Sequence, residues 1–196
     1  MNAYTLRPPR PGARRAKSRR RRGLSLFGVL MALGIAAAAV VGVVAIYNTT
    51  TETQNRNEAQ ALMTSLVIAV RQIHQGAADY GTADLVPLLA LRNAIPSSAR
   101  RGNTIVHPFG DNVTVNGSAT SGAANGRFTI TFANLEPANC AMLLDPYIGQ
   151  TSAGGLLWGV QGSAESAVSQ LTTALNPTTI GARCGTTTGP VVLEFE

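Results

Sequence analysis

The chain has 196 residues, of which 45% are hydrophobic and 13% are charged, and its formal net charge is +6. This length allows one sizeable domain or two small ones. The charge is unevenly placed: residues 1–23 contain nine of the sixteen Lys and Arg residues and no acidic residue, whereas the rest has seven basic and ten acidic residues. The basic character therefore belongs to the N-terminal segment. Because no aromatic side chains are interleaved with its arginines, we predict no specific nucleic-acid binding.

Residues 24–51 form an uninterrupted segment without a charged residue. As a helix this segment would be about 42 Å long at ~1.5 Å per residue, which exceeds the ~30 Å hydrocarbon core of a bilayer. The basic residues before it predict that its N-terminal end stays in the cytoplasm. A secretory signal is cleaved after its apolar segment, but here the natural cleavage point, Gly23, precedes it. We therefore expect a disordered leader, residues 1–23, to be removed and the apolar helix to be kept; a plain single-pass anchor is the alternative.

The polar stretch after Tyr47 leads into an amphipathic segment. Neither Pro nor Gly interrupts residues 43–75, so the simplest interpretation is one helix over residues 24–77. Its second half, residues 52–77, has one apolar stripe and needs a domain, residues 78–196, to cover that stripe. The stripe consists of apolar residues at spacings of three and four, namely Ala59, Leu62, Met63, Leu66, Val70 and Ile73.

The rest of the chain predicts short helices and an antiparallel sheet, which together with the long helix give an α+β fold. Helices are expected over residues 84–92 and from the prolines of Glu136-Pro137 and Asn176-Pro177. Strands are expected at residues 104–106, 113–115, 127–132, 156–160 and 191–195. Asn116-Gly117 predicts a hairpin turn. Arg100-Arg101 is interpreted as an exposed loop, and residues 163–175 as either a helix or a polar excursion.

Two cysteines, Cys140 and Cys184, lie in the C-terminal part of the chain. A domain that is exported across the membrane enters an oxidising compartment, which favours one disulfide between them. The alternative is a pair of buried free thiols.

These features resemble the type IV pilins, specifically the type IVb class, over nearly the whole chain. The basic leader followed by Gly23 and Leu24-Ser25-Leu26 is similar to a prepilin peptidase site. The long leader and a first mature residue other than Phe are typical of the b class. His107-Pro108-Phe109-Gly110 is similar to the family's Asn-Pro-Phe-Gly turn, and the segments around Cys140 and Cys184 resemble those that carry the family's bridging cysteines.

The resemblance implies cleavage after Gly23, N-methylation of Leu24 and a long helix packed on a small antiparallel sheet domain. It implies a self-assembling structural subunit, first in the inner membrane and then in an extracellular pilus filament. The implied partners are further copies of the chain in a helical filament, prepilin peptidase, the pilus assembly platform in the inner membrane, and minor pilins.

Gly28 departs from the family pattern, because this position usually carries a glutamate. In the family that carboxylate is thought to pair with the amino terminus of a neighbouring subunit. Since the family's exception is a minor subunit at the fibre tip, a minor pilin or a type II secretion pseudopilin is the alternative function. A more remote alternative is a membrane-tethered exported enzyme or binding domain.

The sequence predicts no catalytic, cofactor or metal site, and so no enzyme. His74 and His107 have no Cys, Asp or second His at the spacing of metal ligands, and no Gly-x-Ser-x-Gly motif occurs. The apolar neighbours of Trp158 favour a core or subunit-contact role for that ring. Three aspartates are interpreted as turn or capping residues: Asp84, Asp111 and Asp145.

Overall fold

The computed structural model describes residues 26–77, 79–118, 126–153 and 156–196. By its internal contacts the chain divides into two units, Met1–Ile46 and Tyr47–Glu196, and each is described by itself. The predicted leader, residues 1–23, and the predicted cleavage and methylation site at Gly23 and Leu24 lie outside the described residues. Those features therefore stay predictions.

Helix α1, Leu26–Ile73, contains 48 residues and confirms the expectation of one long helix. It ends at Ile73 rather than at residue 77, because a turn follows in which Gly76 has a φ of +86°. This left-handed backbone is accessible to glycine at little cost and cannot continue a right-handed helix. By length and composition alone, α1 is the one helix among the described residues that could cross a membrane.

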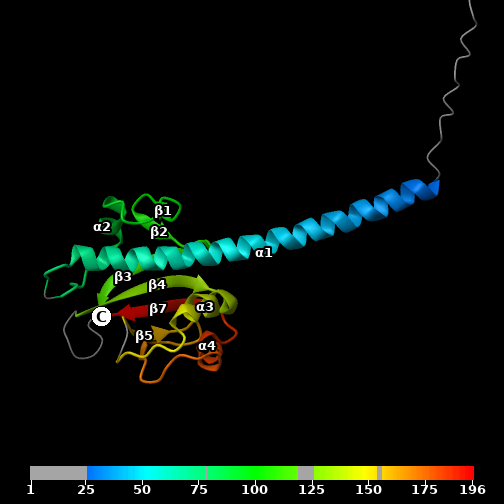
Figure 1. Ribbon diagram of the computed structural model, residues 1–196. Coiled ribbons are helices and arrows are strands. Elements are labelled where there is room, and N and C mark those ends of the chain that lie inside the picture. Colours follow the sequence, from blue (N-terminus) through cyan, green and yellow to red (C-terminus); the bar gives the residue numbers. More distant parts are fainter. Residues whose placement is uncertain (1–25, 78, 119–125, 154–155) are drawn as a thin grey trace, which may run out of the picture. The chain divides into compact units, whose positions relative to one another are not determined.

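The second unit contains a seven-stranded sheet in the order β1-β2-β3-β4-β7-β5-β6, and all its pairs of neighbouring strands are antiparallel. The strands are β1 (Arg100–Arg101), β2 (Thr104–Val106), β3 (Asn112–Ser118), β4 (Arg127–Leu135), β5 (Leu157–Gln161), β6 (Ser169–Gln170) and β7 (Gly189–Phe195). Strand β7 is last in sequence, yet it lies between β4 and β5 near the middle of the sheet (Figure 1).

Short helices follow the predicted starts closely. They are α2 (Val86–Leu91), α3 (Pro137–Leu144), the single 3₁₀ turn η1 (Asp145–Tyr147) and α4 (Pro177–Cys184). Each of the three α-helices has a proline in its first turn, where the missing N–H costs nothing. At the start of α4, the Asn176 side chain accepts the Thr179 N–H, and the Thr179 hydroxyl accepts the Asn176 N–H in return. This capping box sets the start of α4.

The core lies between residues 47–73 of α1 and the sheet (Figure 1). In the predicted stripe, Ile73 is half-buried and every other member is buried. On β4, Phe128, Ile130 and Phe132 are fully buried in the same core, whereas Thr129 and Thr131 between them are partly exposed. The predicted alternation along this strand is therefore confirmed.

Four local predictions need correction. Asn116-Gly117 is not a hairpin turn but part of β3. A Cβ on Gly117 would overlap the carbonyl oxygen of Gly81, so this glycine permits a close approach of two backbone segments rather than a turn. Arg100-Arg101 forms strand β1 instead of a loop. For residues 163–175 the helix alternative is wrong: the segment is the expected polar excursion and includes the short strand β6. The strand expected from Leu156 begins at Leu157, and Leu156 itself is exposed.

Candidate assembly surfaces

The N-terminal half of α1 exposes an unusually large apolar surface. Its large side chains are exposed by 40–78%, and none of those described in this half is buried. They are Leu26, Phe27, Val29, Leu30, Met31, Leu33, Ile35, Val40, Val41, Val43, Val44 and Ile46. Soluble domains rarely expose contiguous apolar surface of this kind, which marks a surface made for lipid or for other protein.

Small residues interrupt this apolar surface at Gly34, Ala36 to Ala39 and Gly42. Among the described residues of its own unit, a Cβ added at Gly34 or Gly42 would meet no atom within 4 Å, so no contact described there requires a glycine at either position. Small side chains let two helices approach closely. This part of α1 is therefore suited to packing against other helices.

Gly28 lies in the first turns of α1, and no acidic residue occurs in the first turn. The first carboxylate of the whole chain is that of Glu52. The N-terminal part of α1 thus offers no side-chain anion to a neighbouring amino terminus.

The two cysteines form the predicted disulfide. Cys140 in α3 and Cys184 at the end of α4 are both buried, and their Cα atoms are 5.7 Å apart. No free cysteine occurs in the described residues, and the sequence contains no third cysteine, so the free-thiol alternative is wrong. The bridge fixes the two short helices to each other.

A second set of contacts, which the sequence did not predict, holds the end of α4. Arg183 Nη1 lies 3.0 Å from the carboxylate of Glu165, 3.1 Å from the carbonyl oxygen of Val160 and 2.6 Å from the hydroxyl of Ser169. The Ser163 hydroxyl donates a buried hydrogen bond of 2.7 Å to the carbonyl oxygen of Cys184. The segment after β5 is therefore fastened to α4 independently of the disulfide.

His107 begins the predicted turn and is 2% exposed. The Gly110 N–H donates to the His107 carbonyl oxygen at 2.9 Å, and Gly110 has a φ of +100°. The ring Nδ1 accepts the Phe109 N–H at 3.2 Å, which assigns the proton to Nε2, and Nε2 donates to the Ala133 carbonyl oxygen of β4 at 3.0 Å. Burial lowers the pKa of His107, because an apolar environment disfavours the charged form. His107 is thus a neutral structural residue that fixes the turn to the sheet.

A polar cluster on the opposite face of the sheet was missed by the sequence analysis. Glu194 of β7 is completely buried and accepts a hydrogen bond of 2.7 Å from the Ser118 hydroxyl of β3. Burial raises the pKa of Glu194, while the Ser118 hydrogen bond and the Arg127 charge act in the other direction. Arg127 lies 4.0 Å above the Trp158 ring, a cation–π arrangement. Trp158 is buried, so its predicted packing role is confirmed.

The remaining singled-out residues serve local structure. His74 Nδ1 lies 3.0 Å from the Val70 carbonyl oxygen. Asp84 accepts the Val86 N–H at 2.9 Å near the start of α2, as a turn residue does. Asp145 instead forms an ion pair with Arg56 of α1 at 2.9 Å. Among the described residues, no group of three or more His, Cys, Asp and Glu side chains is arranged to hold a metal ion.

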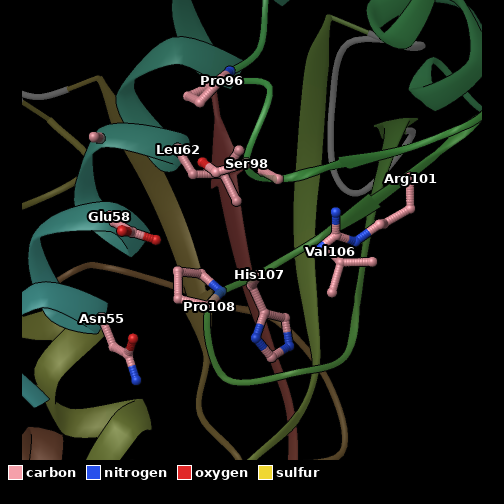
Figure 2. Close-up of a pocket in the computed structure, with 11 residues that line it drawn as sticks. Asn55, Glu58, Leu62, Pro96, Ser98, Arg101, Val106, His107 and Pro108 are labelled. Atoms are coloured by element: carbon pink, nitrogen blue, oxygen red, sulfur yellow. The ribbon is translucent and has the colours of Figure 1, made fainter. Parts of the chain in front are cut away.

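A groove of about 360 Å³ lies between residues 55–62 of α1 and the segment from Pro96 to Pro108. Figure 2 shows Glu58 on the helix wall and Arg101 on the opposite wall, with His107 and Pro108 drawn between them. Both Glu58 and Arg101 are exposed. The groove is therefore part of the outer surface of the second unit and has one charge of each sign.

Comparison with known proteins gives three consistent results. Residues 50–193 match the family described as PilS N terminal. The chain is 28% identical over 177 residues to the major structural subunit of bundle-forming pilus from Escherichia coli O111:H-, with 85% of this chain and 89% of the relative covered. It is 25% identical over 162 residues to the toxin coregulated pilin of Vibrio cholerae, with 78% of this chain and 72% of the relative covered.

The fold agrees with these matches. The crystal structure of TcpA, a type IV pilin from the El Tor biotype of Vibrio cholerae, superposes with a TM-score of 0.51 at 20% identity, covering 73% of this chain and 99% of that one. That structure shares the long helix packed on an antiparallel sheet. The chain belongs to the PilS family and is a type IVb pilin.

Proposed function

We propose that this pilin is a structural subunit of a type IVb pilus and polymerises through the N-terminal half of α1. The observation that carries the proposal is the exposed apolar surface of residues 26–46, which no part of its own unit covers among the described residues. Burying such a surface against neighbouring copies is strongly favourable in water. The relatives support the same function, because one is named as a major structural subunit of a pilus and another as a pilin.

The precursor is inserted in the inner membrane with residues 1–23 in the cytoplasm. Prepilin peptidase cleaves after Gly23, and Leu24 becomes the N-methylated first residue. The assembly platform in the inner membrane then moves subunits from lipid into an extracellular filament of many copies, together with minor pilins. The basic leader and the uncharged segment that follows it support this order of events.

Mass spectrometry of subunits from sheared surface filaments tests this proposal directly. We expect the N-terminal peptide to begin at methylated Leu24, and filaments to be lost when prepilin peptidase is absent. A mature chain that begins beyond Ala39, or one that retains its leader in a peptidase-competent host, would contradict the proposal. In either case the apolar helix would not be the mature N-terminus.

Gly28 favours a second candidate, a minor pilin or pseudopilin that initiates or tips the fibre. An amino terminus buried without a nearby anion is costly, and this cost is paid once at a tip but at every subunit in a shaft. Filament stoichiometry separates the two: a shaft subunit dominates sheared filaments, whereas an initiator is scarce in them and its deletion stops assembly. Gly28→Glu should increase filament yield if the missing carboxylate limits polymerisation.

A further inference from the structure

Most charged side chains after residue 51 are bonded inside the subunit. Arg56 and Arg183 form ion pairs, Arg71 donates to the terminal carbonyl oxygen of Glu196, and Arg100 donates to Asn93. Within the described residues, the side chains of Arg92 and Arg101 make no hydrogen bond or ion pair. In the same part of the chain, four glutamate side chains also make none: Glu52, Glu58, Glu136 and Glu196.

Two of these glutamates lie on α1 directly after its apolar half. Glu52 and Glu58 are exposed and are separated by about 9 Å along the helix at ~1.5 Å per residue. We call this pair the acidic collar. Between residues 24 and 70 the chain contains one cation, Arg56, and that cation is bonded to Asp145. The acidic collar is therefore not neutralised by its own helix.

The two arginines lie on the segment that contains α2 and β1, which we call the arm. Arg92 follows α2 directly and Arg101 ends β1, and both are exposed. We call this pair the basic arm surface. Arg101 and Glu58 line opposite walls of the groove without forming an ion pair within the subunit (Figure 2). The subunit thus carries an acidic surface on α1 and a basic surface on the arm, and the charges of both are unpaired.

The acidic collar lies close to the apolar half of α1, because Glu52 is only about 8 Å along the helix from Tyr47, at ~1.5 Å per residue. We consider a filament in which the apolar halves of adjacent copies pack side by side, with their acidic collars close together. Carboxylates of adjacent copies then approach one another, and like charges brought together at an interface oppose association. Cations placed between them remove that repulsion, and the free cations of the described residues are those of the basic arm surface.

We propose that Arg92 and Arg101 of one subunit bind Glu52 and Glu58 of an adjacent copy in the filament. If the acidic collar of one copy faces the basic arm surface of the next copy without a reciprocal second pair, the contact is heterologous and repeats from copy to copy instead of closing as a dimer. This is the geometry that a fibre requires. The inference rests on the proposed pilus function, and it adds which side chains set the contact between subunits.

Charge reversal with rescue tests the contact in the full chain expressed in a piliated host. We expect Glu52→Arg and Arg101→Glu each to lower the mass of sheared filaments by about tenfold or more, because each creates a like-charge contact. The double variant, which restores opposite charges, should recover most of the filament mass. Glu136→Arg is the matched control: it makes the same change in charge at an unpaired glutamate outside both surfaces, and it should leave the yield unchanged. An intact Cys140–Cys184 disulfide and an unchanged unfolding temperature show that each variant folds.

Cross-linking gives an independent readout. Since both native cysteines are already paired, Glu52→Cys combined with Arg101→Cys should yield a ladder of disulfide-linked subunits from filaments, whereas Glu136→Cys with Arg101→Cys should not. The inference is overturned if single reversals assemble normally, or if the double variant is not rescued and no ladder forms. A wild-type chain that makes no filament contradicts the proposed pilus function instead, so the two failures are distinguishable.

Discussion

Reduction of the Cys140–Cys184 disulfide should lower the free energy of unfolding of the second unit, by an amount that the length of the closed loop predicts. The bridge spans a sequence separation of 44 residues. Closing a loop of this length in the unfolded chain lowers its entropy by about 13 cal/mol/K, which corresponds to about 4 kcal/mol at 25 °C. For a unit of this size, ~1 kcal/mol shifts the unfolding temperature by about 2–4 °C. We therefore expect reduction to lower the unfolding temperature by roughly 8–16 °C.

The reduced protein should still fold, because α4 has other attachments. Its start is held by the capping box at Asn176. Near its end, Arg183 binds Glu165 across the segment after β5, and the Cys184 carbonyl oxygen accepts the buried hydrogen bond from Ser163. We expect one cooperative transition at a lower temperature rather than separate melting of α4.

Circular dichroism of the full-length pilin in detergent, with and without reductant, measures this effect. The double variant Cys140→Ala, Cys184→Ala is the control, since reductant should not change its unfolding temperature. A shift below about 2 °C on reduction of the wild type would refute the loop-entropy reasoning. It would mean that the unfolded chain is already constrained, or that the reduced native state gains compensating contacts.

Three further experiments test the packing of the core, the contacts of Arg183 and the titration of His107. Leu66→Ala should lower the free energy of unfolding by about 2–5 kcal/mol in denaturant titrations, since Leu66 is 0% exposed, whereas Ile68→Ala, at a position that is 50% exposed, should change it by no more than about 0.5 kcal/mol. Arg183→Met should cost about 1–3 kcal/mol by the same assay, because it leaves the half-buried Glu165 carboxylate without its partner; a neutral result would contradict the role assigned to Arg183. The wild type should lose stability relative to His107→Asn as the pH falls below 6.5, because the folded state lowers the pKa of His107 and the unfolded chain takes up the proton first. Equal pH dependence of the two proteins would contradict this assignment.

The sequence predicted well the features that depend on a pattern repeated over many residues or on the local effect of a single residue. The stripe of α1 repeats over many turns, so its period identifies both the helix and its buried face. A proline favours the first turn of a helix through a local backbone effect, and α3 and α4 both begin at the predicted prolines. The disulfide could be predicted because the chain has only two cysteines and because an exported domain enters an oxidising compartment.

The failures come from contacts between distant segments. Asn116-Gly117 has the chemistry of a turn, but Gly117 is needed where the backbone at Gly81 approaches β3 closely, and this contact overrides the local preference. Strands β1 and β6 are two residues long, too short for alternation to be detected. Glu194 and Ser118 are separated by 76 residues, and no local pattern indicates that a carboxylate so near the end of the chain is buried.

In assembly, too, a long apolar pattern and specific contacts between distant residues have different effects. Residues 26–46 of α1 are apolar on all sides, and their large side chains are exposed, so burying them favours association strongly without selecting one rotation or one register. Directional contacts have to supply that selection, and charged groups at the edge of an apolar interface fix register more effectively than they add affinity. The acidic collar follows this segment directly in the sequence, on the same helix. The apolar half of α1 therefore explains why copies associate, and the unpaired charges just beyond it explain how one arrangement is chosen among many of similar apolar burial.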